Sequence, residues 1–396
     1  MSKPKVAFVV PRCGAEIFGG AEVYCLELAR RLGPYWDIDV LTTCARDYMT
    51  WKNEYPEGHA YEEGVRVQRF PVDRPRDVPH FNRLSERVSF DVQRSSISLQ
   101  EEWMRAQGPV STEMERYVAS HRFRYDAFFF FSYLYATTYA LLPLVEEKAF
   151  LVPFAHDEWP LRMRIWDEFF KRPQCLVFNT PEEHDFVRAR FSRSGVDGPI
   201  IGAGVQPPAY ADAESFRSRF GITEPFILYL GRIDPSKGCD VLIEDFARFR
   251  TTHAAPAKLV LIGELHLLLK KHPGVMVLGP VDDQTKWDAL AACDLLAMPS
   301  AFESLSLAVL EAWSLGKAVL VNAHAAALVG QCKRSGGGLW YSNYEEFEAA
   351  LAVMDEDVRK KLGRQGMDFI NDSCRWESVE GAYRRLLNRS DEMADV

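Results

Sequence analysis

The feature that most limits the possible folds of this chain is its two series of short, almost wholly apolar runs. Stretches long enough for a helix separate the runs. A run of four to seven apolar residues is typical of a parallel strand that is covered on both faces, because neither face meets water. The first series comprises residues 5–10, 37–43, 65–72, 125–131, 149–155 and 175–180; the second comprises residues 225–231, 258–263, 275–279, 294–300 and 317–322. Each series predicts one doubly wound α/β sheet.

A chain of 396 residues is too long for one ordinary core, which agrees with two domains. Residues 204–214 have the composition of a linker, so we expect a first domain over residues 1–205 and a second over 206–375. Residues 76–120 are polar and arginine-rich, and they break the strand rhythm as a helical insertion in the first domain. Residues 375–387 have the pattern of an amphipathic helix. Ligands of such sheets bind beyond the carboxyl ends of the strands, so we expect the two domains to face each other across a binding cleft.

The composition excludes several classes of protein. A net charge of −9 argues against a general nucleic-acid binder, which is usually basic. The eight cysteines form no C-x-x-C pair, so neither a zinc site nor a redox motif is indicated. The start of the chain has no secretory signal pattern, which favours a cytoplasmic location. Residues 127–145 lack charge over nearly the length of a membrane span, but the serine, threonines and proline within them favour a buried strand, a turn and a buried helix.

Two glycine-containing loops follow predicted strands. Gly19 and Gly20 precede a predicted helix, where glycine allows close backbone approach and the helix offers free N–H groups to an anion. The loop "GRIDPSKG", residues 231–238, lacks the G-K-[ST] of a P-loop, so ATP hydrolysis is not indicated. It does hold two cations, Arg232 and Lys237, which suit a phosphate, although solvated surface charge is the alternative.

Two carboxylates interrupt the otherwise apolar stretch "SAFESLSLAVLEAWSLGKAVL", residues 300–320. Glu303 precedes a helix predicted to start near residues 304–306, and Glu311 lies within it. The backbone N–H groups of Leu305, Ser306 and Leu307 would point into the same space as Glu303. A ligand with an anionic middle and hydroxylated ends, such as a nucleotide sugar, fits this set; a helix-dipole acid and an exposed helix acid are the alternative. His156 ends another predicted strand, where a structural role is the alternative to a site role.

Taken together, these segments resemble the family 4 retaining glycosyltransferases of the glycogen-synthase-like superfamily. The resemblance is carried by "GGAE" (19–22), His156, "GRIDPSKG" (231–238) and "ESLSLAVLE" (303–311), in the family's order and across most of the chain. It implies the GT-B fold, two facing Rossmann-like domains with an interdomain cleft. It also implies that residues 376–396 form a helix that crosses back to the first domain.

The resemblance further implies a role for each candidate residue. Arg232 and Lys237 would hold the donor diphosphate, with the backbone of residues 305–307 also meeting phosphate. Glu303 would bind hydroxyls of the donor sugar and Glu311 the ribose. Gly19 and Gly20 would lie close to the donor, with Gly20 approaching its diphosphate or sugar, and His156 would contact the transferred sugar. His156, Glu303, Arg232 and Lys237 would thus form the catalytic set, with no cofactor and no metal required.

The expected partners are a nucleotide-sugar donor and a glycan or lipid-linked acceptor, used in polysaccharide or lipid-linked saccharide synthesis in the cytoplasm or at the inner membrane face. The sequence departs from the family pattern at Ser304 and Ser306, where many relatives have glycine, and at Ala318, where proline is common. Three alternatives stay open: a sugar-nucleotide epimerase, a phosphorylase of the same fold, and a noncatalytic sugar-nucleotide sensor.

Overall fold

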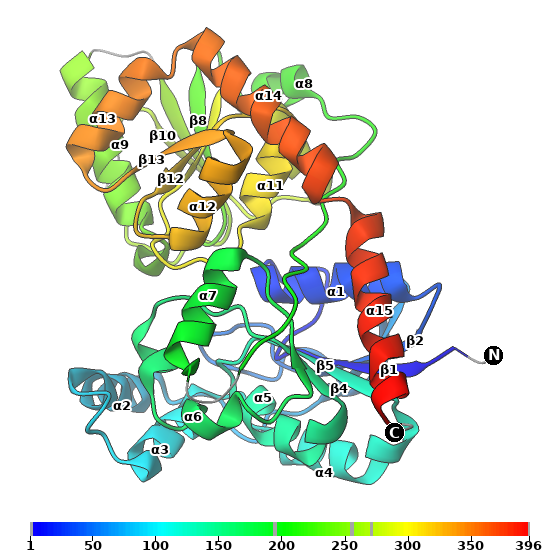
Figure 1. Cartoon of the computed structure of the whole chain (residues 1–396). Helices are drawn as coiled ribbons and strands as arrows, with labels where there is room; N and C mark the ends of the chain where they lie inside the picture. Colours follow the sequence, from blue (N-terminus) through cyan, green and yellow to red (C-terminus); the bar gives the residue numbers. More distant parts are fainter. Residues whose placement is uncertain (1–2, 193–195, 254–256, 270–271, 395–396) are drawn as a thin grey trace. The chain divides into compact units, whose positions relative to one another are not determined.

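The computed structural model describes residues 3–192, 196–253, 257–269 and 272–394 (Figure 1). The chain divides into two compact units. The first contains residues 1–202 together with the C-terminal residues from Glu380 onward, and the second contains residues 203–379. The predicted boundaries were 205/206 and 375/376, so the observed division falls a few residues away from each.

The first unit is built on one seven-stranded sheet with the order β3-β4-β2-β1-β5-β6-β7. All neighbouring strands run parallel except β3, which pairs with β4 as an antiparallel hairpin. The sequence did not predict β3, because its alternating polar pattern lacks the apolar run of a strand that is buried on both faces. The strands are β1 (Lys5–Val9), β2 (Asp37–Thr43), β3 (Gly58–Glu62), β4 (Val65–Phe70), β5 (Ala127–Phe131), β6 (Ala149–Val152) and β7 (Cys175–Leu176).

Helices cover both faces of this first sheet, with α1 on one side and α4 and α5 on the other (Figure 1). The predicted start of one helix is confirmed: Thr180 caps α7 by accepting a hydrogen bond from the Glu183 amide at 3.2 Å, and Pro181 occupies the first helical position. The polar insertion at 76–120 is helical, as predicted. The helices are α1 (Gly20–Leu32), α2 (Val78–Phe90), α3 (Ile97–Gln107), α4 (Thr112–His121), α5 (Ala136–Leu141), α6 (Trp166–Phe169) and α7 (Pro181–Arg190).

The uncharged stretch at 127–145 contains the central strand β5 and the short helix α5, as predicted. Every residue of β5 is buried, which explains why the strand is almost entirely phenylalanine. Ser132, with a φ of 72°, makes the turn between the two elements. Across the described residues, no helix combines the length and the apolar character needed to cross a membrane.

The second unit has a six-stranded, fully parallel sheet with the order β10-β9-β8-β11-β12-β13. The first strand of the unit, β8, lies in the middle, and the chain proceeds to β9 on one side and later to β11 on the other. The edge between β8 and β11 is therefore the topological switch point, where ligands of such sheets bind. The strands are β8 (Phe226–Leu230), β9 (Lys258–Ile262), β10 (Val275–Gly279), β11 (Leu295–Met298), β12 (Val319–Asn322) and β13 (Gly338–Tyr341).

Helices also flank the second sheet, where α8 packs against α10 and both α11 and α12 pack against α14. The strand β13 was not predicted, because only two of its four residues are fully buried and its glycine-rich start reads as a loop. The helices are α8 (Ala213–Phe220), α9 (Cys239–His253), α10 (Asp283–Ala292), α11 (Leu307–Ser314), α12 (Ala326–Ser335), α13 (Tyr344–Val353) and α14 (Glu356–Ser373).

The last helix, α15 (Trp376–Ala394), belongs to both units. Its first turn groups with the second unit, where Trp376 packs against Gly204 so closely that a Cβ on Gly204 would lie 2.5 Å from the indole. From Glu380 onward the helix groups with the first unit. There the Tyr383 hydroxyl lies 3.1 Å from the Tyr24 hydroxyl, and the Tyr383 ring contacts Phe129 of the first sheet.

Candidate functional site

The loop after β8 starts with an unusually close approach between two strand ends. Gly231 and Gly263 directly follow β8 and β9 and have φ values of 141° and 142°, which residues with a side chain rarely adopt. A Cβ on Gly263 would lie 1.9 Å from the Gly231 carbonyl oxygen, so only glycine fits there. The Ile233 amide then donates to the Glu264 carbonyl at 2.8 Å, which continues the pairing past the strands. The backbone of the segment that follows β9 therefore fixes the start of the loop that follows β8.

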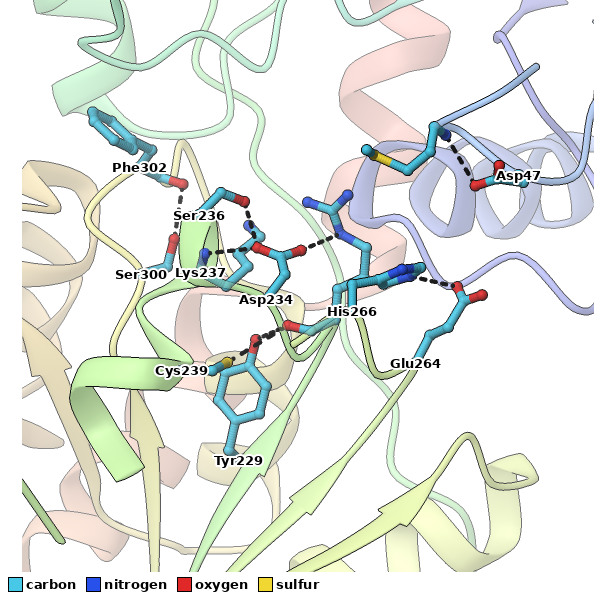
Figure 2. Close-up of polar contacts among 12 residues, drawn as sticks. Asp47, Tyr229, Asp234, Ser236, Lys237, Cys239, Glu264, His266, Ser300 and Phe302 are labelled. Carbon is cyan, nitrogen blue, oxygen red and sulfur yellow. Dashed lines mark hydrogen bonds and ion pairs between the residues drawn. The ribbon is translucent and has the colours of Figure 1, made fainter. Parts of the chain in front are cut away.

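Asp234 organises the rest of this loop (Figure 2). Its buried carboxylate accepts hydrogen bonds from the Ser236 hydroxyl at 2.5 Å and the Lys237 amide at 3.0 Å, and so caps the short 3₁₀ turn Pro235–Lys237. Its second oxygen lies 3.4 Å from Arg232 Nε. Asp234 was not among the residues predicted from the sequence, although Asp followed by Pro is a recognisable turn-start signal. This acid holds both predicted cations, Arg232 through its side chain and Lys237 through its backbone.

Two buried side chains contact the backbone carbonyl of Arg232. The Tyr229 hydroxyl donates to the Arg232 carbonyl at 2.6 Å, and the Cys239 thiol lies 3.6 Å from the same oxygen (Figure 2). Burial raises the pKa of Cys239 to about 11 and the pKa of Tyr229 well above its usual value. Both groups therefore keep their protons at neutral pH and act as donors. Cys239 has a structural role here, because its thiol is neither exposed nor ionised.

The loop after β11 carries the second half of the candidate site. The Ser300 hydroxyl donates to the Phe302 carbonyl at 3.2 Å (Figure 2). Asn322 Nδ2 donates to the Pro299 carbonyl at 2.7 Å, and together these bonds fix the chain ahead of Glu303. Ser306 is the N-cap of α11 and accepts from the Val309 amide at 3.4 Å. Helix α11 thus starts at Leu307, close to the predicted position. Gly238 packs on this loop, because a Cβ there would lie 2.6 Å from the Pro299 carbonyl oxygen.

An ion pair joins the two loops. Lys237 Nζ, after β8, lies 2.7 Å from Glu303 Oε1, after β11, and both side chains are partly buried. Because β8 and β11 flank the switch point, this pair lies where a doubly wound sheet binds its ligand. The structure therefore brings Arg232, Lys237 and Glu303 to one place, as the sequence predicted. It adds that Lys237 and Glu303 form an ion pair with each other.

Glu311 is held by a partner that the sequence did not reveal. Lys286 of α10 places its Nζ 2.6 Å from Glu311 Oε1 and 2.8 Å from Asp283 Oδ1. Burial raises the pKa of Glu311, and Lys286 acts in the opposite direction. Burial also works against the charge on Lys286, but Glu311 and Asp283 together keep its pKa above the usual value. A helical lysine read alone is an ordinary surface residue, so nothing in the sequence marked Lys286.

The three remaining candidates belong to the first unit, and each follows a strand of its sheet. Gly19 is the N-cap of α1, and a Cβ there would lie 2.1 Å from Glu22 Oε2. Gly20 differs, because a Cβ there would have no described heavy atom within 4 Å. His156 follows β6, with its Nδ1 3.7 Å from Glu158 Oε1. Gly19 therefore lies against the end of the Glu22 side chain, whereas Gly20 has no such neighbour.

Comparison with known proteins agrees with this architecture. A family model described as "Glycosyl transferases group 1" matches residues 211–367, which lie in the second unit. The D-inositol 3-phosphate glycosyltransferase of Segniliparus rotundus is 27% identical over 237 residues, covering 54% of this chain and 52% of that protein. An uncharacterized glycosyltransferase of Methanocaldococcus jannaschii is 26% identical over 43% of this chain and 44% of its own length. The chain thus spans about half the length of these curated relatives.

Solved structures match over almost the whole chain. Sucrose-phosphate synthase from Thermosynechococcus elongatus aligns with a TM-score of 0.72 at 16% identity, covering 98% of this chain and 99% of that one. HepE of Anabaena, solved with UDP-glucose, aligns with a TM-score of 0.67 at 14% identity, covering 97% and 99%. At these identities the likeness concerns the fold. The chain therefore has the GT-B fold of two parallel-sheet α/β domains, and its second domain is similar to the group 1 glycosyl transferases.

Proposed function

We propose that the protein is a retaining glycosyltransferase, which moves a sugar from a nucleoside-diphosphate sugar to a hydroxyl of a glycan or lipid-linked acceptor. The observation that carries the proposal is the Lys237–Glu303 pair at 2.7 Å, which spans the switch point of the second sheet. A cation for phosphate and an acid for sugar hydroxyls are thereby held side by side. The names of the relatives support the same reaction class, and HepE was solved with UDP-glucose.

Donor binding would exchange each internal contact for a contact with the ligand. Lys237 would turn from Glu303 to the diphosphate, and Glu303 would then accept hydrogen bonds from the hydroxyls of the donor sugar. Arg232, positioned by Asp234, would bind a second phosphate oxygen. The backbone N–H groups of residues 305–307, at the start of α11, would add a partial positive charge. Glu311 would bind the ribose while Lys286 keeps part of its charge compensated.

Sugar transfer would begin with departure of the nucleoside diphosphate. The bond between the anomeric carbon and the phosphate oxygen breaks, an oxocarbenium-like sugar forms, and the acceptor hydroxyl attacks from the face that the leaving group vacated. A phosphate oxygen of the leaving group takes the proton of the acceptor. Arg232 and Lys237 stabilise the charge on the leaving diphosphate, the largest contribution expected from the protein, so that no metal is required. His156 would contact the sugar during transfer.

Alanine variants of the two cations test this proposal. R232A and K237A should each reduce turnover of a nucleoside-diphosphate sugar about 100-fold, the usual effect of removing one stabilising donor of a developing charge. R364A, which removes an exposed arginine of α14 in the same unit, is the matched control and should turn over normally. A chelator should leave the wild-type rate unchanged. Sugar transfer by both site variants at the control rate would refute the proposal.

An incubation with labelled donor separates the alternative reactions. With donor and no acceptor, an epimerase would change the sugar stereochemistry, and with inorganic phosphate a phosphorylase would form a sugar phosphate. A glycosyltransferase should give transfer only when a hydroxyl acceptor is present, apart from slow hydrolysis. A noncatalytic sensor would bind the donor and leave it intact under all conditions. A thermal-shift screen across nucleoside diphosphates and their sugars would first identify the donor.

A further inference from the structure

Four loops at the carboxyl edge of the first sheet converge on Trp51. Arg12 follows β1, Trp51 follows β2, Arg76 follows β4 and Tyr135 follows β5. Trp51 is 1% exposed, and its indole Nε1 donates to the Gln107 carbonyl at 2.6 Å. The Tyr135 ring stands edge-on to the indole with 5.5 Å between centroids. Trp51 is thus a rigid surface for whatever packs on its faces.

Two guanidinium groups lie over this one indole. The Cζ of Arg76 is 5.0 Å from the centre of the Trp51 ring and 4.5 Å from the Phe81 ring, and the Cζ of Arg12 is 6.0 Å from the centre of Trp51. Cation–π contact favours each group separately, but the two positive charges repel each other. Such an arrangement is costly unless negative charge is supplied nearby.

Arg12 has a negatively charged partner within the protein, whereas Arg76 has none among the described residues. Arg12 Nη2 lies 2.6 Å from Glu22 Oε1. Arg76 forms no ion pair with any residue that the structure describes, and its Nε and Nη2 donate to the carbonyl and side-chain oxygens of Gln107. Its Nη1 donates to no atom of the described chain. A guanidinium carries five N–H donors, so two of them still lack a protein acceptor.

Asp47, the acid that acts electrostatically on Arg76, is already engaged in hydrogen bonds. Asp47 accepts hydrogen bonds from the Met49 and Thr50 amides, each at 2.9 Å, and from the Thr50 hydroxyl at 2.6 Å (Figure 2 shows the Met49 contact). Burial lowers the pKa of Arg76 to about 10, while Tyr135, Tyr48 and Asp47 raise it and Arg12 lowers it further. Arg76 therefore stays charged at neutral pH, in a place where a neutral side chain would cost less.

We infer that the Nη1 edge of Arg76 binds an oxyanion of the acceptor, a phosphate or a carboxylate, beside the Trp51 ring. The inference rests on the proposed function, because it assigns a chemical class to the acceptor of that reaction. Arginine suits this task, since it presents its donors in a fixed plane that the Gln107 contacts orient. The acceptor is then an anionic molecule, and Arg76 selects it over a neutral one.

Calorimetric titration with inorganic phosphate and with acetate tests this site. UDP at saturating concentration keeps phosphate out of the donor site of the full chain. R76Q, which retains a donor for the Gln107 carbonyl, should weaken phosphate or acetate binding at least about tenfold. R83Q, an exposed arginine on α2, is the control and should bind within about twofold of wild type. Comparison of phosphate with acetate shows which oxyanion is preferred.

Equal binding by wild type and R76Q would overturn the inference. If R76Q does not fold, R76K serves instead: it keeps the charge but cannot reach Gln107 and the ligand together, so a loss of about fivefold is expected and unchanged binding refutes the site. UDP binding in the same samples separates the two ideas. Normal UDP binding without an Arg76-dependent response removes this inference alone, whereas an Arg76-dependent response without binding of any nucleoside diphosphate removes the proposed reaction.

Discussion

Lys237 Nζ lies 2.7 Å from Glu303 Oε1, an ion pair that connects the loops on the two sides of the switch point in the second sheet. In the proposed reaction, Lys237 would bind the diphosphate of the donor and Glu303 the hydroxyls of its sugar. The two charges of the pair thus balance each other, and in the proposed reaction a donor that brings both a diphosphate and hydroxyls would replace both halves of the pair. A ligand with only one of these groups would leave one residue without a partner.

The two residues of this pair should therefore respond differently to substitution. E303Q removes the competitor for Lys237, so we expect the affinity for the nucleoside diphosphate to stay constant or rise, while sugar transfer falls about 100-fold. K237M should weaken diphosphate affinity about 10- to 100-fold, the effect of losing one charged hydrogen bond of about 1.5–3 kcal/mol. Titration calorimetry and initial rates measure the two effects. A parallel loss of diphosphate affinity in E303Q would contradict the exchange of partners.

Substitution of two glycines separates a structural role from a role in binding. G20A should leave the melting temperature unchanged, because no described heavy atom lies within 4 Å of the added Cβ. It should nevertheless raise the KM for the donor, because the added methyl group would prevent the proposed close approach of the donor to the Gly20 backbone. G263A should lower stability by about 3 kcal/mol or more, because its Cβ would lie 1.9 Å from the Gly231 carbonyl at an unfavourable φ. Thermal melts and donor kinetics provide the readouts; normal kinetics in G20A would count against the predicted contact.

Glu183 should make the stability of the protein depend on pH. Its carboxylate is buried and accepts from the Ala155 amide at 2.6 Å and the Asn179 amide at 2.7 Å. Burial raises the pKa of Glu183 from 4.5 to about 8, although these hydrogen bonds oppose the shift. Between these values the unfolded chain has lost the proton that the folded chain keeps. Stability should therefore be full below pH 4.5 and should fall by a few kcal/mol as the pH rises through 8.

Denaturant titrations across this pH range check the prediction, with E183Q as the variant that cannot ionise. E183Q should be less stable than wild type at low pH, because its amide nitrogen faces backbone donors, and it should show a smaller decline between pH 5 and 8. The sign of the slope is the decisive result. A wild-type stability that increases over that range would mean that the hydrogen bonds from Asn179 and Ala155 outweigh burial.

The contact of α15 with the first unit should contribute strongly to stability. Tyr383 is fully buried and meets the Tyr24 hydroxyl at 3.1 Å, and Tyr24 in turn donates to the Gly202 carbonyl at 2.8 Å. Y383F should cost about 1 kcal/mol, the value of one hydrogen bond, and Y383A about 3–5 kcal/mol. The control R385A changes an exposed residue of the same helix and should have little effect. Chemical denaturation measures all three; equal stabilities of Y383A and R385A would show that the helix is not anchored there.

The strands buried on both faces were predictable from the sequence because burial leaves an unbroken apolar run, as in β5 and β8. β3 and β13 were missed, because β3 alternates polar and apolar residues and β13 begins in a glycine-rich segment, so neither shows a long apolar run. Within the site, Arg232, Lys237 and Glu303 stood out as charged residues at the ends of apolar runs. Their partners did not stand out. Lys286 on α10 meets Glu311 on α11 only because the fold brings the two helices together, and no local sequence pattern encodes that contact.

Helix α15 also has a practical consequence for anyone dividing this protein into parts. Because the residues from Glu380 onward belong to the first unit, that unit is not one continuous stretch of sequence. A fragment truncated after Gly202 would uncover the aromatic surface around Tyr24 and Phe129 and would tend to aggregate. A stable excised half would need the last helix reattached, for example by a short engineered connection from Gly202 to Glu380.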